Sequence, residues 1–169
     1  MSALPAAGFY REGAPRLVAT LAVVLAGLWL VQIYPQADAL LNPLNILTAQ
    51  VSASLLAAIG LPVTQELTRL THASGFSCEI DSACTAFVPV VLLTGAILGW
   101  RAPRRWQLVG ALVGVVVLSL INQLRLVSLV WLGVQAPAWF ELAHVWLWPA
   151  ALLFVIAGYW YVWARVQWS

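Results

Sequence analysis

Charged side chains are scarce in this 169-residue chain, where they make up 8% of the residues. A soluble domain carries about a quarter. Hydrophobic residues make up 63%, and the mean hydropathy is +0.91. A chain this apolar cannot cover a water-facing surface, so we expect an integral membrane protein. Lysine is absent and the eight arginines form no large basic patch outside the apolar runs, which argues against a nucleic-acid-binding protein.

Cysteine is almost as scarce, with two residues in the chain. Cys78 and Cys84 are six positions apart, which matches neither a zinc site nor a Cys-x-x-Cys redox pair. The sequence as a whole implies no metal and no organic cofactor. The first apolar run is too long for a signal peptide and no small-residue cleavage site follows it closely, so it is expected to remain as an anchor.

Four apolar stretches approach the length of about 20 residues that a bilayer span requires. They run from about 17–34, 83–100, 106–133 and 144–163. Arginine clusters mark cytoplasmic loops, and six of the eight arginines fall on one side of these spans, at positions 11, 16, 101, 104, 105 and 165. The sequence predicts an all-α, polytopic membrane bundle with both termini in the cytoplasm, in a single domain over residues 1–169.

The segment 39–63 is apolar but carries several polar side chains. Leucines, Val51 and Ala58 recur at three- and four-residue steps and form one helical face, while Asn42, Asn45, Thr48 and Ser52 lie on the other. A fifth full span would invert every later span and move the arginine-rich turn outward. We therefore predict an amphipathic helix on the outer side that lies in the interface or is partly inserted. A polar-faced transmembrane helix is the alternative.

Three chemically active residues are predicted to lie at the outer side of the membrane. Cys84 begins the second span in the stretch "DSACTAF", Arg125 lies in the third in "INQLRLVS", and His144 opens the fourth in "ELAHVWLW". An arginine inside a span costs at least about 2.5 kcal/mol on insertion scales and is by default a functional hypothesis. Asn122 lies one turn away on the same helical face. The structural alternative is an Arg125 that extends to the headgroups or pairs with Glu141.

These residue types together suit acyl transfer. A base or a nearby cation activates a thiol, imidazole can take its proton and deliver it to a leaving amine, and guanidinium can stabilise the oxyanion. Spacing alone does not establish that the three side chains meet.

The motifs "DSACTAF", "NQLR" and the later His144 resemble, in order and in membrane depth, the exosortase/archaeosortase family of membrane transpeptidases, particularly its short exosortase H-like members. The resemblance covers about residues 81–148. It implies that Cys84 is the nucleophile, Arg125 the transition-state stabiliser and His144 the general acid/base, with Asn122 in support. Many relatives have Cys-Ser-Gly, whereas Thr85 and Ala86 follow the cysteine here.

The resemblance also implies the substrates and the location. Family members are thought to cleave exported proteins before a C-terminal membrane helix, which follows a short motif and precedes a basic cluster. They then transfer the new carboxyl end to an acceptor. The expected location is the bacterial inner membrane, with the active site facing the periplasm. The recognised motif, the acceptor (water, lipid or polysaccharide) and the oligomeric state are not implied.

Three residues near Cys84 carry open alternatives. Cys78 can form a disulfide with Cys84 outside the cytoplasm, although we expect a free nucleophile. Glu79 and Asp81 are candidates to orient His144 or to contact the substrate, or are simply solvated loop carboxylates. A carboxylate beside Cys84 raises the pKa of its thiol, so neighbourhood in sequence is no argument for activation.

Two rival functions also fit the sequence. A membrane thiol-disulfide oxidoreductase would use Cys78 and Cys84 as a pair. A non-enzymatic membrane scaffold would use Arg125 and Asn122 to hold helices together.

Overall fold

The computed structural model describes residues 6–33 and 36–166 of the chain. Tyr34, the predicted last residue of the first span, lies outside the described residues, as do both chain ends. The helices are α1 (Ala6–Ile33), α2 (Gln36–Ala58), α3 (Phe87–Gly99), α4 (Arg104–Gln135), α5 (Pro137–Leu142) and α6 (Trp148–Val166). A five-residue π-helical turn, Ala143–Leu147, joins α5 to α6 without a break.

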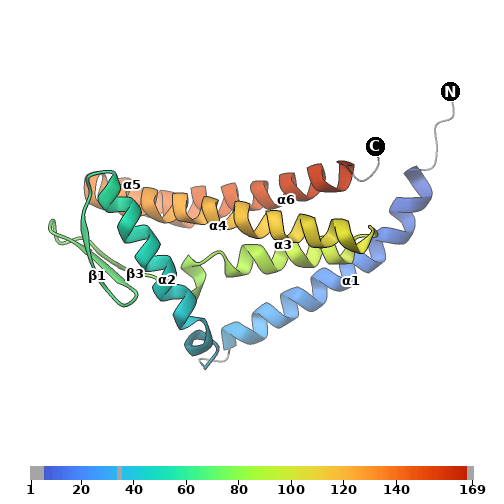
Figure 1. Ribbon diagram of the computed structural model, residues 1–169, viewed down its shortest axis with the longest axis horizontal. Helices are drawn as coiled ribbons and strands as arrows, with labels where there is room; N and C mark the ends of the chain where they lie inside the picture. Colours follow the sequence, from blue (N-terminus) through green and yellow to red (C-terminus); the bar gives the residue numbers. More distant parts are fainter. Residues whose placement is uncertain (1–5, 34–35, 167–169) are drawn as a thin grey trace.

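Helices α3, α4 and α6 run lengthwise beside one another, and α1 packs along α3 (Figure 1). Helix α2 runs steeply across one end of this bundle, where it contacts α4 and the turn before α3. The start of α1 and the end of α6 lie at the opposite end of the molecule (Figure 1). The bundle therefore has two distinct ends, one with α2 and one near the termini.

Small residues set the close approach of the helices. Gly95 and Gly99 of α3 lie against α1, Gly110 of α4 lies against Trp163 of α6, and Gly114 lies against α3. Both pairs have the Gly-x-x-x-Gly spacing, which places two small residues on one helical face. A methyl group at most of these positions would collide with a neighbouring helix, so the glycines determine how tightly the bundle packs.

A three-stranded antiparallel sheet, which the sequence analysis did not predict, lies between α2 and α3 in the chain. Its strands are β1 (Val63–Glu66), β2 (Arg69–His72) and β3 (Ser77–Glu79), in the order β1-β2-β3. Leu70 of β2 and Ile80, which directly follows β3, are buried. They join a hydrophobic core with Leu56 of α2 and Leu126 of α4. The all-α prediction is therefore incomplete: the molecule is mainly helical, and the small sheet covers one end of it.

The end of α2 turns the chain into this sheet. Gly60 has a φ of 82°, a left-handed conformation that glycine adopts without strain. The Leu61 N–H donates to the Leu56 carbonyl at 2.9 Å and the Gly60 N–H donates to Ala57 at 3.0 Å. This pair of bonds is a Schellman cap, and burial of both leucines in the same core completes it.

The predicted spans agree only partly with the helices. Within the described residues, three helical stretches are long and apolar enough to cross a membrane: Ala39–Ala58, Arg104–Gln135 and Pro137–Val166. Pro15–Trp29 and Phe87–Gly99 are apolar but shorter. The second predicted span begins about four residues too early, because its first residues form a turn. The fourth begins too late, because the helical stretch that contains it starts at Pro137, the first residue of α5 and a position that favours proline.

Helix α2 turns most of its polar face inward, although Asn42 of that face is exposed. Asn45, Thr48 and Ser52 are buried, and the Ser52 hydroxyl donates to the Gln123 side chain of α4 at 2.8 Å. On the outer face, Leu40 is 83% exposed and Leu47 is 56% exposed. An interfacial helix would present its polar face to water, whereas α2 presents polar groups to the protein and apolar groups outward. Contact of that outer face with lipid is the arrangement this pattern favours.

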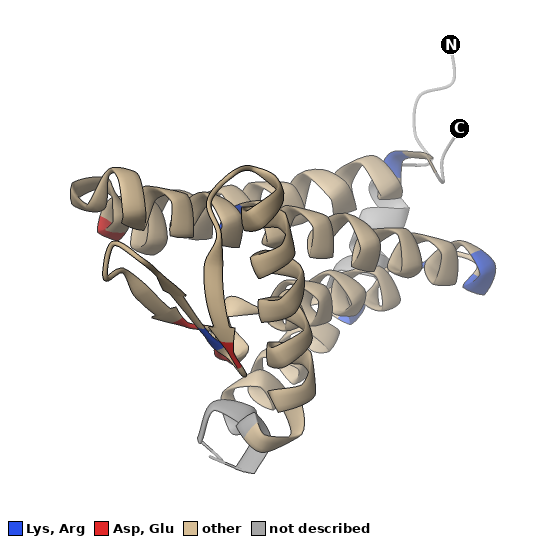
Figure 2. Ribbon diagram, turned by 60° about the vertical axis from the view of Figure 1, so that its left-hand side comes forward, with Lys and Arg blue, Asp and Glu red and all other residues tan. Residues whose placement is uncertain are grey.

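Charge separates along the molecule. In Figure 2 basic residues gather at the end near the termini, and acidic residues gather at the end with the sheet. The two described basic residues away from the first group are Arg69, which pairs with Glu79 across the sheet, and Arg125. A long uncharged zone lies between the two ends, as expected for a membrane protein.

Candidate active site

A short turn positions the thiol of Cys84. Residues Ser82–Cys84 form a 3₁₀ turn directly before α3. The backbone N–H of Cys84 donates to both the carbonyl and the side-chain Oδ1 of Asp81, each at 3.0 Å. Asp81 therefore caps the turn, and Cys84 precedes α3 instead of lying within the second span as predicted.

Thr85 connects this turn to α3. It is 1% exposed; its hydroxyl donates to the Ser82 carbonyl at 2.8 Å and accepts from the Phe87 N–H at 3.3 Å. Thr85 and Ala86 have φ values of −90° and −74°, which any residue adopts. The backbone after Cys84 thus needs no glycine, and the departure from Cys-Ser-Gly is accommodated.

Two side chains of α4 bind the carbonyls of the cysteine turn. Asn122 Nδ2 donates to the Cys84 carbonyl at 2.9 Å, and Arg125 Nη1 donates to the Ala83 carbonyl at 3.4 Å. Non-helical backbone at membrane depth is tolerated only where protein or a cavity satisfies it, and these bonds supply that satisfaction. Among the described residues Arg125 has no ion pair with Glu141; its exposure is 7%, and its Nε has no hydrogen-bond partner.

His144 lies in the π-helical turn between α5 and α6. The Trp148 N–H donates to the Ala143 carbonyl five residues earlier, which defines the wider turn. Pro149 follows and has no N–H to donate to the carbonyl one α-helical turn before it, which favours a local departure from the α-helix. Single π turns occur frequently at functional sites. His144 therefore lies well inside the long helix and does not open it, contrary to the prediction.

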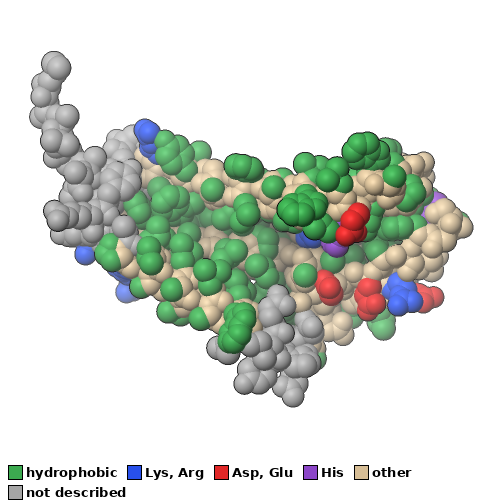
Figure 3. Space-filling view, turned by 180° about the vertical axis from the view of Figure 1, so that it is seen from behind, with side chains coloured by type: hydrophobic (Ala, Val, Ile, Leu, Met, Phe, Trp, Pro, Cys, Tyr) green, Lys and Arg blue, Asp and Glu red, His purple; other side chains and the backbone are tan. Residues whose placement is uncertain are grey.

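Cys84, Arg125 and His144 line one cavity of about 240 Å³. Asp81, Glu79 and Cys78 also line it, together with apolar residues of α4 and Phe140. The Phe140 ring lies 5.5 Å from the His144 ring, centre to centre, and so limits the positions open to the imidazole. Figure 3 shows a histidine beside a basic side chain on the face where acidic side chains gather. The structure thus brings all three predicted residues together.

The two carboxylates have different surroundings. Asp81 binds the backbone of Cys84, whereas Glu79 pairs with Arg69 at 3.6 Å in an exposed contact. Within the described residues, the side chains of Asp81 and Glu79 bind these partners and not His144. Asp81 is thus a structural support of the cysteine turn, and both residues line the cavity.

The environment of Cys84 favours the neutral thiol. Burial raises the pKa of Cys84 above its usual value of 9.0; the Asp81 carboxylate raises it further, while the Arg125 charge and a backbone hydrogen bond at Asp81 lower it. A thiol with a raised pKa carries little thiolate at neutral pH. Nucleophilic attack by Cys84 therefore requires a base that removes the proton during the reaction.

Cys78 lines the same cavity, and both cysteines are free thiols. Burial, and then the neighbouring Cys84, raise the pKa of Cys78 to about 11. Cys78 thus carries little thiolate at neutral pH.

Two contributors to the site were not found from the sequence. Thr85 holds the cysteine turn through its hydroxyl, and Phe140 flanks the histidine. The hydroxyl directly after Cys84 was a usable signal, since threonine often caps a helix. Phe140, four residues before His144, is on the same helical face, but that spacing is common in any apolar helix.

The architecture defines a membrane-embedded helical bundle with a thiol, a guanidinium and an imidazole in one cavity. The family model of the transmembrane exosortases (Exosortase_EpsH) matches residues 6–158, which is most of the chain. The protein therefore belongs to the transmembrane exosortase family. No curated protein and no solved structure matched the chain.

Proposed function

We propose that the protein is a cysteine transpeptidase or protease that cleaves the C-terminal sorting signal of exported proteins. The observation that carries this proposal is that Cys84, Arg125 and His144 line one cavity. The expected substrates carry a short motif, one membrane helix and a basic cluster. We place the active site at the outer face of the bacterial inner membrane, because the acidic sheet end lies opposite the arginine-rich end.

The proposed reaction has two halves. His144 takes the proton from the Cys84 thiol as the sulfur attacks the amide carbonyl, and Arg125 stabilises the oxyanion. The C–N bond then breaks, the leaving amine takes the proton from His144, and a thioester remains on Cys84. The nucleophile of an acceptor, or water, loses a proton to His144 and attacks the thioester, which releases the product and restores the thiol.

The raised pKa of Cys84 gives His144 a necessary part in this scheme. Arg125 alone does not hold the sulfur as a thiolate, because burial outweighs its charge. The free Nε of Arg125, buried and without a partner, is a donor still available for a substrate oxygen.

The test is to compare protein C-termini in cells that carry the wild type, Cys84→Ala, His144→Ala or Cys78→Ala in place of the native gene. Mass spectrometry of C-terminal peptides would show whether exported proteins end before their C-terminal helix. We expect processing to be lost in the first two variants, with unchanged membrane levels of the variant protein, and retained in Cys78→Ala. Processing by Cys84→Ala would overturn the proposal, and a requirement for Cys78 would favour the oxidoreductase.

A further inference from the structure

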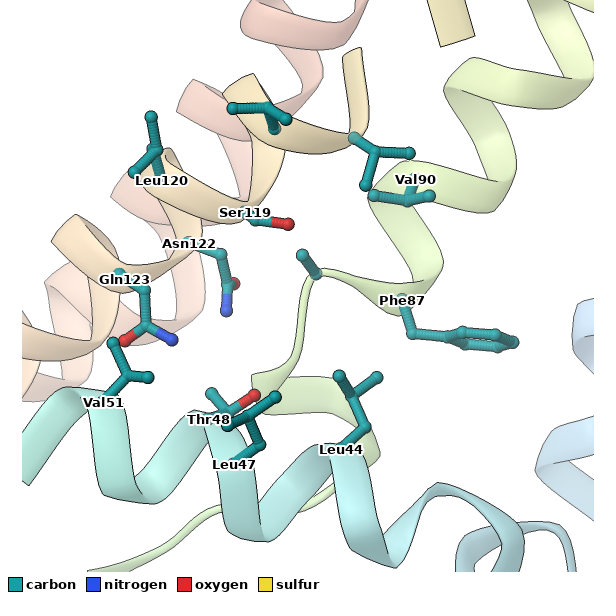
Figure 4. Close-up of a pocket in the computed structure, with 13 residues that line it drawn as sticks. Leu44, Leu47, Thr48, Val51, Phe87, Val90, Ser119, Leu120, Asn122 and Gln123 are labelled. Carbon is teal, nitrogen blue, oxygen red and sulfur yellow. The ribbon is translucent and has the colours of Figure 1, made fainter. Parts of the chain in front are cut away.

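A second and larger cavity lies beside the cysteine turn. It is a groove of about 500 Å³ between α2, the start of α3 and α4 (Figure 4). Its walls are mostly apolar, and Leu47 of α2 and Leu120 of α4 are more than half exposed along its rim. The groove therefore opens sideways from the bundle, toward the region that lipid would occupy.

The inner wall of the groove carries hydrogen-bonding groups. Thr48, Ser119, Asn122 and Gln123 point toward its centre in Figure 4. Asn122 is 2% exposed and its Nδ2 binds the Cys84 carbonyl, while its Oδ1 has no partner. A buried acceptor without a hydrogen-bond partner is unfavourable. A ligand that donates a hydrogen bond here would remove that cost.

The ligand must be apolar along its length and carry N–H or O–H donors at one point. The first turn of a transmembrane helix has this chemistry, because its first four N–H groups have no partner within the helix. A lipid acyl chain also fits apolar walls, but it offers no donor to Asn122 or to the two hydroxyls. The polar inner wall thus favours a polypeptide.

We propose that this groove, formed by α2, α3 and α4, receives the first turn of the substrate's membrane helix. Asn122 Oδ1 accepts one of the free N–H groups, and Thr48 and Ser119 offer further acceptors. This inference rests on the proposed function, because it takes the occupant to be the protein that is cleaved. Asn122 lines the groove and binds the Cys84 carbonyl, so a helix that begins here starts next to the cysteine turn.

Photocrosslinking tests the groove directly. Benzoylphenylalanine replaces Leu47, Leu120 or, as a control on α6, the exposed Phe154, each in a Cys84→Ala background. The probe is a synthetic peptide with a short polar segment, twenty leucines and alanines, and three arginines, in phosphatidylcholine vesicles. We expect peptide adducts at Leu47 and Leu120, mapped to the start of the helix, and background labelling at Phe154. Equal labelling at all three positions would overturn the proposal, and lipid adducts alone would assign the groove to an acyl chain.

A matched pair on α2 tests the hydrogen bonds. Thr48→Val removes a hydroxyl from the groove, whereas Ser54→Ala removes an exposed hydroxyl that binds its own helix at Gln50. We expect Thr48→Val to weaken the peptide adduct at Leu120 about fivefold, the effect of one neutral hydrogen bond. Ser54→Ala should leave it unchanged, and equal effects would contradict the polar role of the groove. Crosslinking needs no cleavage, so adducts without processing would refute only the cysteine chemistry, and processing without adducts would refute only the groove.

Discussion

Cys84 is held near Arg125 by hydrogen bonds from side chains of α4 to backbone carbonyls of the cysteine turn. Asn122 and Arg125 hold the carbonyls of Cys84 and Ala83, and Asp81 holds the Cys84 N–H. These bonds fix the turn while the thiol faces the cavity, where Sγ has a weak contact of 3.9 Å with the Glu79 carbonyl. Asn122 and Asp81 are therefore positioning residues, and their replacement should alter the geometry or charge at Cys84.

The charge of Asp81 can be tested separately from its capping role. Asp81→Asn keeps an oxygen that accepts from the Cys84 N–H but removes the negative charge that raises the Cys84 pKa. The pKa should fall, so more thiolate is present at pH 8, and alkylation by iodoacetamide should accelerate roughly threefold to tenfold. Intact mass against time, in a Cys78→Ala background, measures this rate.

Glu79→Gln is the matched control for that experiment. It removes a nearby carboxylate that pairs with Arg69 and does not contribute to the shift at Cys84. Its alkylation rate should equal that of the parent. A slower rate in Asp81→Asn would mean that the cap, and not the charge, controls the reactivity of the thiol.

Contacts between helices determine whether the site assembles at all, because Cys84, Arg125 and His144 come from three separate elements. Helix α6 packs on α4 through Trp163, and Tyr159 donates to the Gly110 carbonyl at 2.6 Å. The Trp163 indole N–H also donates to the Trp106 carbonyl at 3.2 Å. The alignment of α4 with the helix that carries His144 therefore depends on a close approach at Gly110.

A methyl group at Gly110 should disturb this alignment. Gly110→Ala places the methyl against the Trp163 ring, and we expect a loss of about 1–3 kcal/mol in the free energy of unfolding. Gly158→Ala, on α6, meets nothing within 4 Å and should be neutral or stabilise by up to about 1 kcal/mol. Reversible unfolding in mixed micelles, followed by tryptophan fluorescence, gives both values. Equal stability of the two variants would contradict close packing at Gly110.

At the scale of the whole molecule, the separation of charges predicts an orientation. Arg104 lies at the arginine-rich end and Glu66 in the sheet at the other, and both are exposed. Because arginine-rich loops stay in the cytoplasm, we predict that the sheet and the cavity lie on the outer side.

Single cysteines in a Cys78→Ala, Cys84→Ala background test this orientation. A membrane-impermeant maleimide should label Glu66→Cys in intact spheroplasts and Arg104→Cys only after lysis. The reverse pattern would place the cavity in the cytoplasm. Labelling of both positions from one side would contradict a bundle whose two ends face opposite sides of the membrane.

The sequence predicted the helical membrane class and, through a resemblance that the family match confirms, the exosortase family. Apolar runs and arginine placement suffice for the class, since the cost of burying charge in lipid acts residue by residue. The sequence also singled out Cys84, Arg125 and His144, which the structure brings into one cavity. Their catalytic roles stay a prediction.

The tertiary structure alone decided the remaining features. The sheet depends on the burial of Leu70 and Ile80 against α2 and α4, and such short strands are not stable without that contact. The inward polar face of α2 depends on its partner Gln123, 71 residues further along the chain. The proximity of Cys84 to Asn122 and Arg125 likewise joins residues about forty positions apart. Local patterns determine which segments are helical and apolar, whereas contacts between distant segments decide which faces meet.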